Sequence, residues 1–476
     1  MNKLPSLTPI TSQWMKQIKD DFHLLNDLVA NYGSPINLIN PSLMKDNYQS
    51  YQEVLESFGL KYQVFFARKA NKCQAYVLKA HQEGMGIDTA SLEEYIQCLE
   101  LGLPANQLII TAAIKNENLL RRAVKEGSLI IIDNEDECAQ IQRIAKDQNK
   151  KALVAFRLSG FQSANGEKLY SRFGFDISDF IRFVDDSLLR YDSLEYRGLH
   201  FHLDGYSMDD RGAALESCLA VVDVLEAKGL KTEFIDIGGG LLTQYLENEQ
   251  EWEVFWSQLT RALQGEIPPI TFGNNGLGLR FEHDQVVGKR QTYPFWNTCA
   301  KGKFLQNILS YQTSKGERIG DAISKRGIEL RLEPGRSLLD QTGMTVAKVA
   351  FRKKDSRGDW LIGLEMNMSQ LMSGSADFLL DPWVVYREKQ SDSKSVGVYF
   401  TGAYCLERDV ILKRKIELHQ LPEVGDMVVF PNTAGYMMHF FESSAHLFPL
   451  ASNLIYDESK GLQQDAFVED DSLAHK

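Results

Sequence analysis

The sequence has few of the features that mark secreted, membrane-bound or metal-binding proteins. Its six cysteines are spread over 476 residues and include no Cys-x-x-Cys pair, so we expect no metal site and no redox couple. Such isolated cysteines are typical of the reduced thiols of a cytoplasmic protein. No segment reaches the roughly 18 consecutive apolar residues of a membrane span, and Pro5 and Pro9 interrupt the N-terminus where a secretory signal is apolar. We therefore expect neither a signal peptide nor a transmembrane helix.

Positive charge is also scarce. The chain carries 52 Lys and Arg against 64 Asp and Glu, a net charge of −12, and no basic cluster offsets it. This balance argues against nucleic acid or an anionic membrane as the main partner. With 43% hydrophobic and 24% charged residues, the composition is that of a folded globular protein long enough for two or three domains.

Eight short apolar runs, each too brief for a helix, predict strands that are buried on both faces. Segments of helical periodicity separate them, and several of these end at a glycine. Eight strands alternating with helices predict an α/β fold, a parallel (β/α)8 barrel of the TIM type. The runs are Tyr62–Ala67, Met85–Asp88, Leu108–Thr111, Leu129–Asp133, Leu153–Leu158, Gly198–Leu203, Phe234–Gly238 and Ile328–Glu333.

The spacing of the runs predicts the domain organisation. The stretch from Gly240 to Glu333 is far longer than one crossover needs, so we expect an insertion around residues 245–325 of a barrel that spans residues 41–341. After about residue 342, strand signals alternate with turns and predict a mostly antiparallel β domain at residues 342–476. We expect residues 1–40 to form an N-terminal segment that packs on this β domain.

Reactive side chains follow several of the predicted strands. In barrels of this kind the chemistry lies at the C-terminal ends of the strands. Taken singly, each residue has an ordinary explanation as a solvated charge, a turn or a surface ion pair. Their joint position on one rim indicates a binding site. The residues are Lys69, Asp88, Arg157, His202, Gly238, Gly239, Gly240, Glu333, Gly335 and Arg336.

The chemistry of this set fits pyridoxal 5'-phosphate. The amine of Lys69 can form a Schiff base with the cofactor aldehyde, and a glycine loop with Arg336 can hold the phosphate through N–H groups and positive charge. Glu333 can keep the pyridine nitrogen protonated, which makes the ring a strong electron sink. His202 can stack on the face of the ring.

These motifs resemble those of the fold type III pyridoxal-phosphate-dependent decarboxylases, the group of ornithine, arginine and diaminopimelate decarboxylases. The matches run in the family's order from Tyr62 to Asn453, and we identify the chain with a divergent bacterial branch. The matching motifs are Phe-Ala-Arg-Lys69-Ala-Asn, Gly86-Ile-Asp88-Thr-Ala-Ser91, Leu199-His-Phe-His202, Glu333-Pro-Gly-Arg336, Gly402-Ala-Tyr-Cys405 with Asp409, and Thr433-Ala-Gly-Tyr436.

The resemblance implies an amino-acid decarboxylase that works as a homodimer with shared active sites. It implies that Tyr436 reaches the phosphate and that Cys405 of one subunit completes the site of the other. The reaction would proceed through the Lys69 Schiff base and a quinonoid intermediate, after which Cys405 or Lys69 returns a proton to the α-carbon. Free Lys69 would need a depressed pKa to form its Schiff base readily, and burial near other positive charge can give one.

Two other functions remain open on the same scaffold. One is a pyridoxal-phosphate-dependent racemase or epimerase, although racemases that resemble alanine racemase place an arginine, not a glutamate, at the pyridine nitrogen. The other is a catalytically silent, decarboxylase-like binding protein. The presence of Lys69, His202, Arg336 and Cys405 together argues against that function.

The predicted substrate pocket departs from the family pattern. The residue after the cysteine is acidic in ornithine and diaminopimelate decarboxylases, but it is Leu406 here. Diaminopimelate decarboxylases use an arginine for the distal carboxylate where this chain has Leu380-Asp381-Pro382. We therefore expect Asp381, Leu406 and Asp409 near the substrate, and a basic, amine-bearing or conjugated amino acid in place of diaminopimelate.

Overall fold

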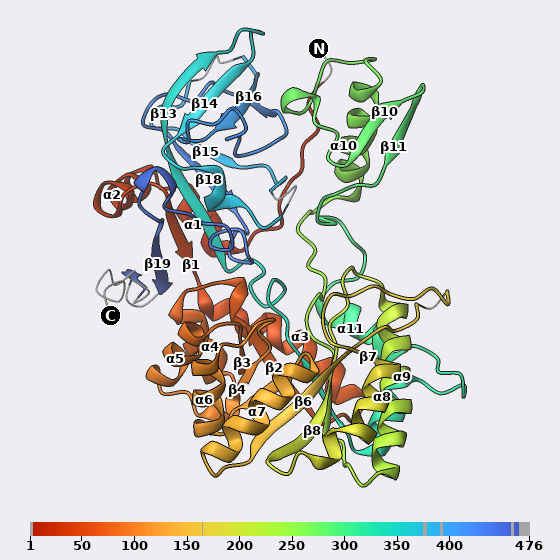
Figure 1. The fold of residues 1–476 in the computed structure, drawn as a ribbon. Coiled ribbons are helices and arrows are strands. Elements are labelled where there is room, and N and C mark those ends of the chain that lie inside the picture. The colour runs from red at the N-terminus through yellow and green to blue at the C-terminus, as the bar shows by residue number, and fades with distance from the viewer. Residues whose placement is uncertain (1–2, 164, 375–377, 391–393, 458–460, 466–476) are drawn as a thin grey trace.

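The computed structural model describes residues 3–163, 165–374, 378–390, 394–457 and 461–465. Figure 1 shows a barrel at the bottom of the view, a β domain above it, and an inserted subdomain beside that β domain. No helix among the described residues is long and apolar enough to cross a membrane.

The barrel contains eight parallel strands that close on themselves. Around the circle the order is β2-β3-β4-β5-β6-β8-β9-β12, and β12 pairs with β2 to complete it. This confirms the predicted fold class. The strands are β2 (Tyr62–Ala67), β3 (Gly86–Thr89), β4 (Leu108–Ile110), β5 (Leu129–Ile132), β6 (Ala152–Ser159), β8 (Leu194–His200), β9 (Phe234–Asp236) and β12 (Glu329–Leu332); the two-residue β7 (Phe175–Asp176) pairs with β6.

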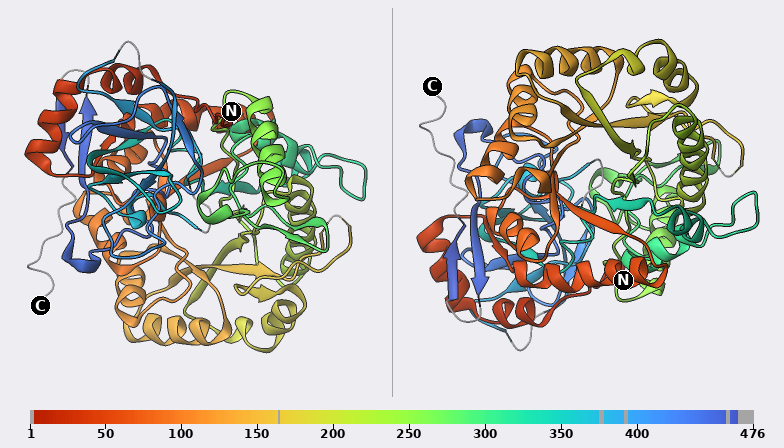
Figure 2. Two further views of the ribbon diagram at one scale, coloured as in Figure 1. Left: turned by 90° about the horizontal axis from the view of Figure 1, so that it is seen from above. Right: turned by 90° about the horizontal axis from the view of Figure 1, so that it is seen from below.

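Helices surround the strands, as the view from below in Figure 2 shows. Their ends follow local sequence signals. The side chains of Ser91, Asn116 and Asn134 accept hydrogen bonds from backbone N–H groups of the first turn. Gly127 and Gly327 end helices in the left-handed region, where glycine has no steric penalty. The helices are α3 (Met44–Ser57), α4 (Gln74–Gln82), α5 (Leu92–Glu100), α6 (Glu117–Glu126), α7 (Glu135–Asp147), α8 (Ile177–Asp186), α9 (Met208–Ala227), α11 (Lys301–Leu309) and α12 (Ile319–Arg326).

The β domain is a second, mostly antiparallel sheet. Its path runs β17-β16-β14-β13-β1-β19-β20, with β18 paired to β13 and β15; β1 (Ile36–Ile39) comes from the N-terminal segment. Two of the pairings are parallel, β1 with β19 and β14 with β16. The strands are β13 (Gly343–Lys354), β14 (Trp360–Leu364), β15 (Trp383–Val385), β16 (Val396–Thr401), β17 (Ile416–Leu418), β18 (Met427–Pro431), β19 (Ser452–Asp457) and β20 (Gly461–Gln464).

The N-terminal segment belongs to this second sheet. It contains α1 (Gln13–Lys19), α2 (Phe22–Tyr32) and β1 (Ile36–Ile39), and β1 inserts between β13 and β19. Ile36 and Leu38 are fully buried in one apolar cluster with Met344 and Val346 of β13. Apolar burial therefore fixes the N-terminal segment on the β domain.

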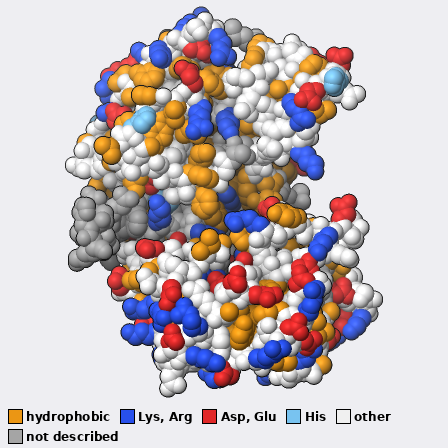
Figure 3. Space-filling view, viewed as in Figure 1, with side chains coloured by type: hydrophobic (Ala, Val, Ile, Leu, Met, Phe, Trp, Pro, Cys, Tyr) orange, Lys and Arg blue, Asp and Glu red, His pale blue; other side chains and the backbone are white. Residues whose placement is uncertain are grey.

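The insertion between β9 and β12 is narrower than residues 245–325. α10 (Glu249–Leu263) and the hairpin of β10 (Leu279–Glu282) and β11 (Gln285–Gly288) form the subdomain beside the β domain (Figure 1). By contrast, α11 and α12 rejoin the helical layer of the barrel. A side chain at Gly302 of α11 would overlap the carbonyl of Ser50 in α3, so these two helices are in close contact. Figure 3 shows the surface hollowed between the insertion and the barrel.

Candidate functional site

A cavity of about 260 Å³ opens at the C-terminal ends of the barrel strands. Six of the residues predicted from the sequence line this cavity. They come from four different barrel strand ends and from the β domain. The geometry thus brings together Lys69, His202, Gly240, Gly335, Arg336 and Tyr436; the other lining residues are Tyr206, Leu241, Tyr293, Ser373 and Phe440.

Lys69 follows β2 and is paired with a buried carboxylate. Its Nζ lies 3.0 Å from Oδ2 of Asp88, and Thr111 donates a hydrogen bond to the other Asp88 oxygen. Burial alone would lower the pKa of Lys69. The negative charges of Asp88 and Glu333 outweigh this effect, so the pKa is raised. The depressed pKa that ready Schiff-base formation would need is therefore not found in the cofactor-free chain, because the nearest charges are carboxylates and not cations.

The Gly238-Gly239-Gly240 loop lies directly against its neighbours. A Cβ at Gly238 would lie 2.6 Å from Nδ1 of His202, and one at Gly239 would lie 2.6 Å from the carbonyl oxygen of Glu333. Gly239 donates its N–H to Nδ1 of His202 at 3.1 Å. Burial lowers the pKa of His202 well below its ordinary value, so the imidazole is neutral, with its remaining proton on Nε2. Only glycine, which has no Cβ, allows the loop to lie this close to His202 and Glu333.

Arg336 lies between the barrel and two aromatic rings. Its guanidinium donates to the carbonyl of Gly435 at 3.2 Å and to Oγ of Ser373 at 3.3 Å. The guanidinium carbon lies 4.5 Å from the ring centre of Tyr293 and 5.2 Å from that of Tyr436. These contacts fix the orientation of the Arg336 guanidinium, which faces the cavity.

Tyr293 belongs to the insertion and was not predicted from the sequence. Its hydroxyl accepts from the N–H of Thr243 at 2.7 Å and donates to the carbonyl of the same residue at 3.2 Å. No motif precedes or follows it, so its position in the cavity depends on how the insertion folds back on the barrel.

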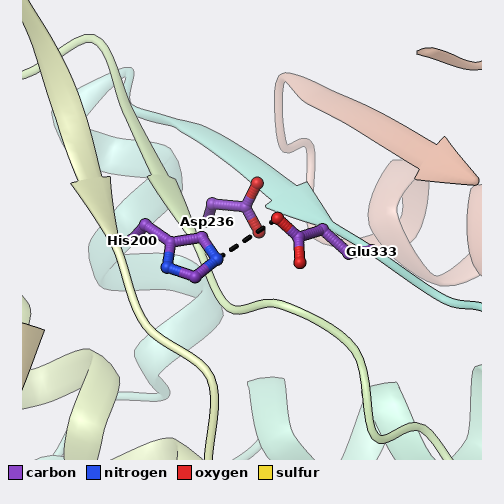
Figure 4. Close-up of side chains that lie close together, drawn as sticks. All are labelled: His200, Asp236 and Glu333. Atoms are coloured by element: carbon purple, nitrogen blue, oxygen red, sulfur yellow. Dashed lines mark ion pairs between the residues drawn. The ribbon is translucent and has the colours of Figure 1, made fainter. Parts of the chain in front are cut away.

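Glu333 follows β12 and is 3% exposed. Its Oε1 lies 3.2 Å from Nε2 of His200, and Asp236 completes a buried cluster of three (Figure 4). Neither His200 nor Asp236 was among the predicted site residues. Both were detectable as polar residues at the inner ends of apolar runs, two positions before His202 and Gly238 respectively.

Arg157, near the end of β6, is 9% exposed. Its guanidinium carbon lies 4.4 Å from the ring centre of Phe173. Within the described part of the chain, Arg157 has no ion-pair partner. Together with Arg172 and His202 it lines a second cavity of about 400 Å³.

Cys405 and Leu406 lie on an exposed loop after β16, and neither lines the cavity around Lys69. Asp409 holds this loop in shape, because its carboxylate accepts the N–H groups of Met368 and Tyr404 at 2.7 Å each. Asp409 is 3% exposed in the single chain, and its contact with substrate stays a prediction.

Asp381 is also engaged elsewhere. Its carboxylate forms an ion pair with Arg414, which is 1% exposed, and it accepts the N–H of Leu7 at 3.0 Å. Asp381 therefore neutralises a buried guanidinium in this chain, and its contact with a substrate stays a prediction.

Comparison with known proteins identifies the family. Residues 44–277 match the family model described as pyridoxal-dependent decarboxylase, pyridoxal binding domain. The uncharacterized protein y4yA of Sinorhizobium fredii is 27% identical over 450 residues, which cover 92% of this chain and 91% of that protein. The diaminopimelate decarboxylase of Staphylococcus aureus is 22% identical over 423 residues, covering 87% and 86%.

Solved structures share the fold. Diaminopimelate decarboxylase from Helicobacter pylori, complexed with L-lysine, superposes with a TM-score of 0.68 at 18% identity, covering 92% of this chain and 95% of that one. Lysine/ornithine decarboxylase from Vibrio vulnificus, complexed with putrescine, gives a TM-score of 0.64 at 18% identity, covering 94% and 99%. The matched cofactor domain and the relatives along nearly the whole chain lead to one conclusion: the chain belongs to the fold type III pyridoxal-phosphate-dependent decarboxylases.

Proposed function

We propose that the protein removes the α-carboxylate of an amino acid, with Lys69 as the residue that carries pyridoxal phosphate. The observation that supports this most directly is the shared cavity, in which an amine, a neutral imidazole, a glycine loop and an arginine face one space. When bound, pyridoxal phosphate supplies the ring that accepts the electrons left on the α-carbon by CO2.

The chain's own residues divide the remaining tasks. Arg336, the hydroxyl of Tyr436 and the N–H groups of the glycine loop would hold the phosphate. The cradle fits such a group, because a Cβ at Gly335 would lie 2.8 Å from the hydroxyl oxygen of Tyr436 and would close the space. Glu333 would hold a proton at the pyridine nitrogen, and Asp88 and Arg157 would face the ring edge.

His202 would lie against the ring face as a neutral group. Its Nδ1 is fixed by the N–H of Gly239, so the imidazole cannot turn freely. Because the imidazole of His202 is neutral, the negative charge of Glu333 would be the dominant influence on the cofactor nitrogen.

The return of a proton to the α-carbon requires a donor at the site. Lys69 lines the cavity, whereas Cys405 is exposed and outside it in a single chain. We therefore propose a homodimer in which the Cys405 loop, with Leu406, closes the site of the partner subunit.

Mixing two inactive variants tests the shared site. Lys69→Ala and Cys405→Ala proteins, mixed under conditions of proven subunit exchange, should recover about a quarter of wild-type activity, because half the dimers are hybrids with one intact site. No recovery would show that each chain supplies its own cysteine or none. Cys405→Ala should still bind the cofactor.

The substrate is proposed to be an amino acid with a conjugated side chain that bears acidic groups. Simple basic or amine-bearing side chains lose support because Asp381 and Asp409 are engaged within the chain and Leu406 replaces an acid. The second cavity instead presents two guanidinium groups, Arg157 and Arg172, against one carboxylate, Asp204. Positive charge there would attract a carboxylate-bearing substituent.

A substrate screen tests the proposal. The protein, supplied with pyridoxal phosphate, is assayed for CO2 release from ornithine, lysine, arginine, diaminopimelate and diamino acids acylated with citrate. We expect release from the acylated compounds, and loss of both release and the cofactor's long-wavelength absorbance in Lys69→Ala. Exchange of the α-proton in heavy water without CO2 would contradict decarboxylation and favour a racemase. A colourless protein that cannot be reconstituted would contradict both enzymes.

A further inference from the structure

Three polar side chains from neighbouring strands meet beneath the candidate cofactor site. His200 ends β8, Asp236 ends β9 and Glu333 follows β12. They are 1%, 1% and 3% exposed, and one possible donor or acceptor atom from each lies within 4.8 Å of the others. Figure 4 shows all three pointing to one point between the strands. The cluster is therefore buried at the C-terminal ends of three neighbouring strands of the barrel.

The cluster has too few hydrogen bonds for its polar atoms. Asp236 uses Oδ1 to accept the N–H of Gly238 at 2.9 Å. Within the described residues, Oδ2 of Asp236, Oε1 of Glu333 and both ring nitrogens of His200 have no well-aligned hydrogen-bond partner, although Nε2 and Oε1 are only 3.2 Å apart. Buried polar atoms without partners are costly, so these groups must share protons with one another.

The surrounding charges decide where the protons reside. Burial raises the pKa of both carboxyls, but Lys69 and Arg157 act against this at Glu333. At Asp236 the negative charge of Glu333 adds to burial, and its pKa is raised well above the ordinary value. The positive charges of Lys69 and Arg157 thus favour the ionised form of Glu333.

The imidazole of His200 stays neutral in this setting. Burial, followed by the positive charge of Arg157, lowers its pKa well below the ordinary value. The charged or titratable groups that act on the three cluster members from the surrounding elements are Lys69, Asp88, Lys115, Arg157 and Arg331. A neutral imidazole has one proton to donate, and Oε1 of Glu333 is the acceptor nearest to Nε2.

We propose that His200 and Asp236 are positioning residues for Glu333: His200 donates its Nε2 proton to Oε1, Asp236 holds the proton shared by the two carboxyls, and the second Glu333 oxygen remains an anionic acceptor for the cofactor nitrogen. Figure 4 shows that second oxygen turned away from the imidazole. This inference rests on the proposed function, because it assigns a supporting pair to the same site. Supporting groups of this kind orient and tune the residue that makes the contact.

The first test uses the cofactor-free protein. Infrared difference spectra should show the carbonyl stretch of a buried protonated carboxylic acid, which disappears in Asp236→Asn and persists in Glu333→Gln. Loss of the band in Glu333→Gln, with retention in Asp236→Asn, would place the proton on the wrong residue and overturn the proposal. A stoichiometric metal ion retained by the purified protein would also overturn it, since the cluster would then hold a cation and not a proton.

The second test uses the protein loaded with ¹⁵N-labelled pyridoxal phosphate. The nitrogen chemical shift reports whether the pyridine nitrogen is protonated. It should move toward the unprotonated value in His200→Phe and in His200→Leu, and it should be restored in His200→Gln, which keeps a donor near Oε1. Activity of the donor-free variants should fall at least about tenfold.

The two variants without a donor keep the test informative if one of them does not fold. An unchanged nitrogen shift in either folded variant would contradict the role of His200. Failure to bind the cofactor would count against the proposed function, whereas the infrared result would still stand.

Discussion

The ammonium nitrogen of Lys69 lies 3.0 Å from Oδ2 of Asp88, a carboxylate that is itself 1% exposed. This pair keeps the lysine charged until the cofactor arrives, because Asp88 and Glu333 raise its pKa in spite of burial. The site of the cofactor-free chain therefore holds Lys69 as a cation.

Asp88→Asn should make Lys69 react with pyridoxal phosphate at lower pH. Without the carboxylate, the pKa of Lys69 falls, and the deprotonated amine appears roughly one to three pH units earlier. The measurement is the rate of cofactor uptake by the cofactor-free protein as a function of pH. Thr111→Val serves as the matched control, because it removes only the hydrogen bond to Asp88; equal midpoints in wild type and Asp88→Asn would contradict the prediction.

Tyr293→Ala should weaken cofactor binding more than Tyr293→Phe. The ring lies 4.5 Å from the guanidinium carbon of Arg336, and such a contact is worth about 0.5–2 kcal/mol, or roughly 2- to 30-fold in Kd. The phenylalanine variant keeps the ring and loses only the hydroxyl contacts with Thr243. Titration of the cofactor-free proteins followed by absorbance measures Kd. Phe281→Ala, on the exposed hairpin of the insertion, should have no effect.

Asp381→Asn should lower stability and leave substrate recognition intact. The change removes the counter-charge of the buried Arg414, which costs about 3 kcal/mol or less, because 27% of the Asp381 side chain is exposed. Urea unfolding gives the free energy, and steady-state kinetics give KM. Recovery of stability in Asp381→Asn with Arg414→Met would support the pairing, whereas a rise in KM at unchanged stability would restore Asp381 to the substrate pocket.

His439 should make the β domain sensitive to acid. It is 3% exposed, and burial lowers its pKa to about 4, while its Nε2 contacts Oδ1 of Asn453 at 2.8 Å. Because this pKa lies below the unfolded value of about 6.5, the stability it contributes is present above pH 6.5 and is lost as the pH falls toward 4, by roughly 1 kcal/mol per pH unit.

Urea unfolding of wild type and His439→Asn between pH 7 and pH 4 checks this prediction. The variant should be less stable at pH 7, and the difference between the two free energies should shrink as the pH falls. His23→Asn, on the exposed side of α2, controls for the loss of an imidazole as such. A difference that stays constant with pH would contradict the assignment.

The barrel was predictable because its strands are buried on both faces. Leu129–Ile132 is continuous in apolar residues and Tyr62–Ala67 is apolar apart from Gln63, and the structure places strands on all eight predicted runs. The β domain was less predictable, since β15 and β17 have only three residues each and β1 comes from the other end of the chain. Short strands leave no periodicity to detect.

For the site, the residues at the strand ends were predictable from sequence, because parallel strands bring their C-terminal ends to one rim for any loop conformation. Lys69, His202, Gly240 and Arg336 follow from that rule. Which carboxylates are available to a ligand depends on the folded arrangement of the chain. In the structure, Asp381 pairs with Arg414 and Asp409 accepts hydrogen bonds at its own loop. Glu333 lies in a cluster with His200 and Asp236. These outcomes depend on contacts between residues distant in the sequence, and packing in three dimensions, not local pattern, selects them.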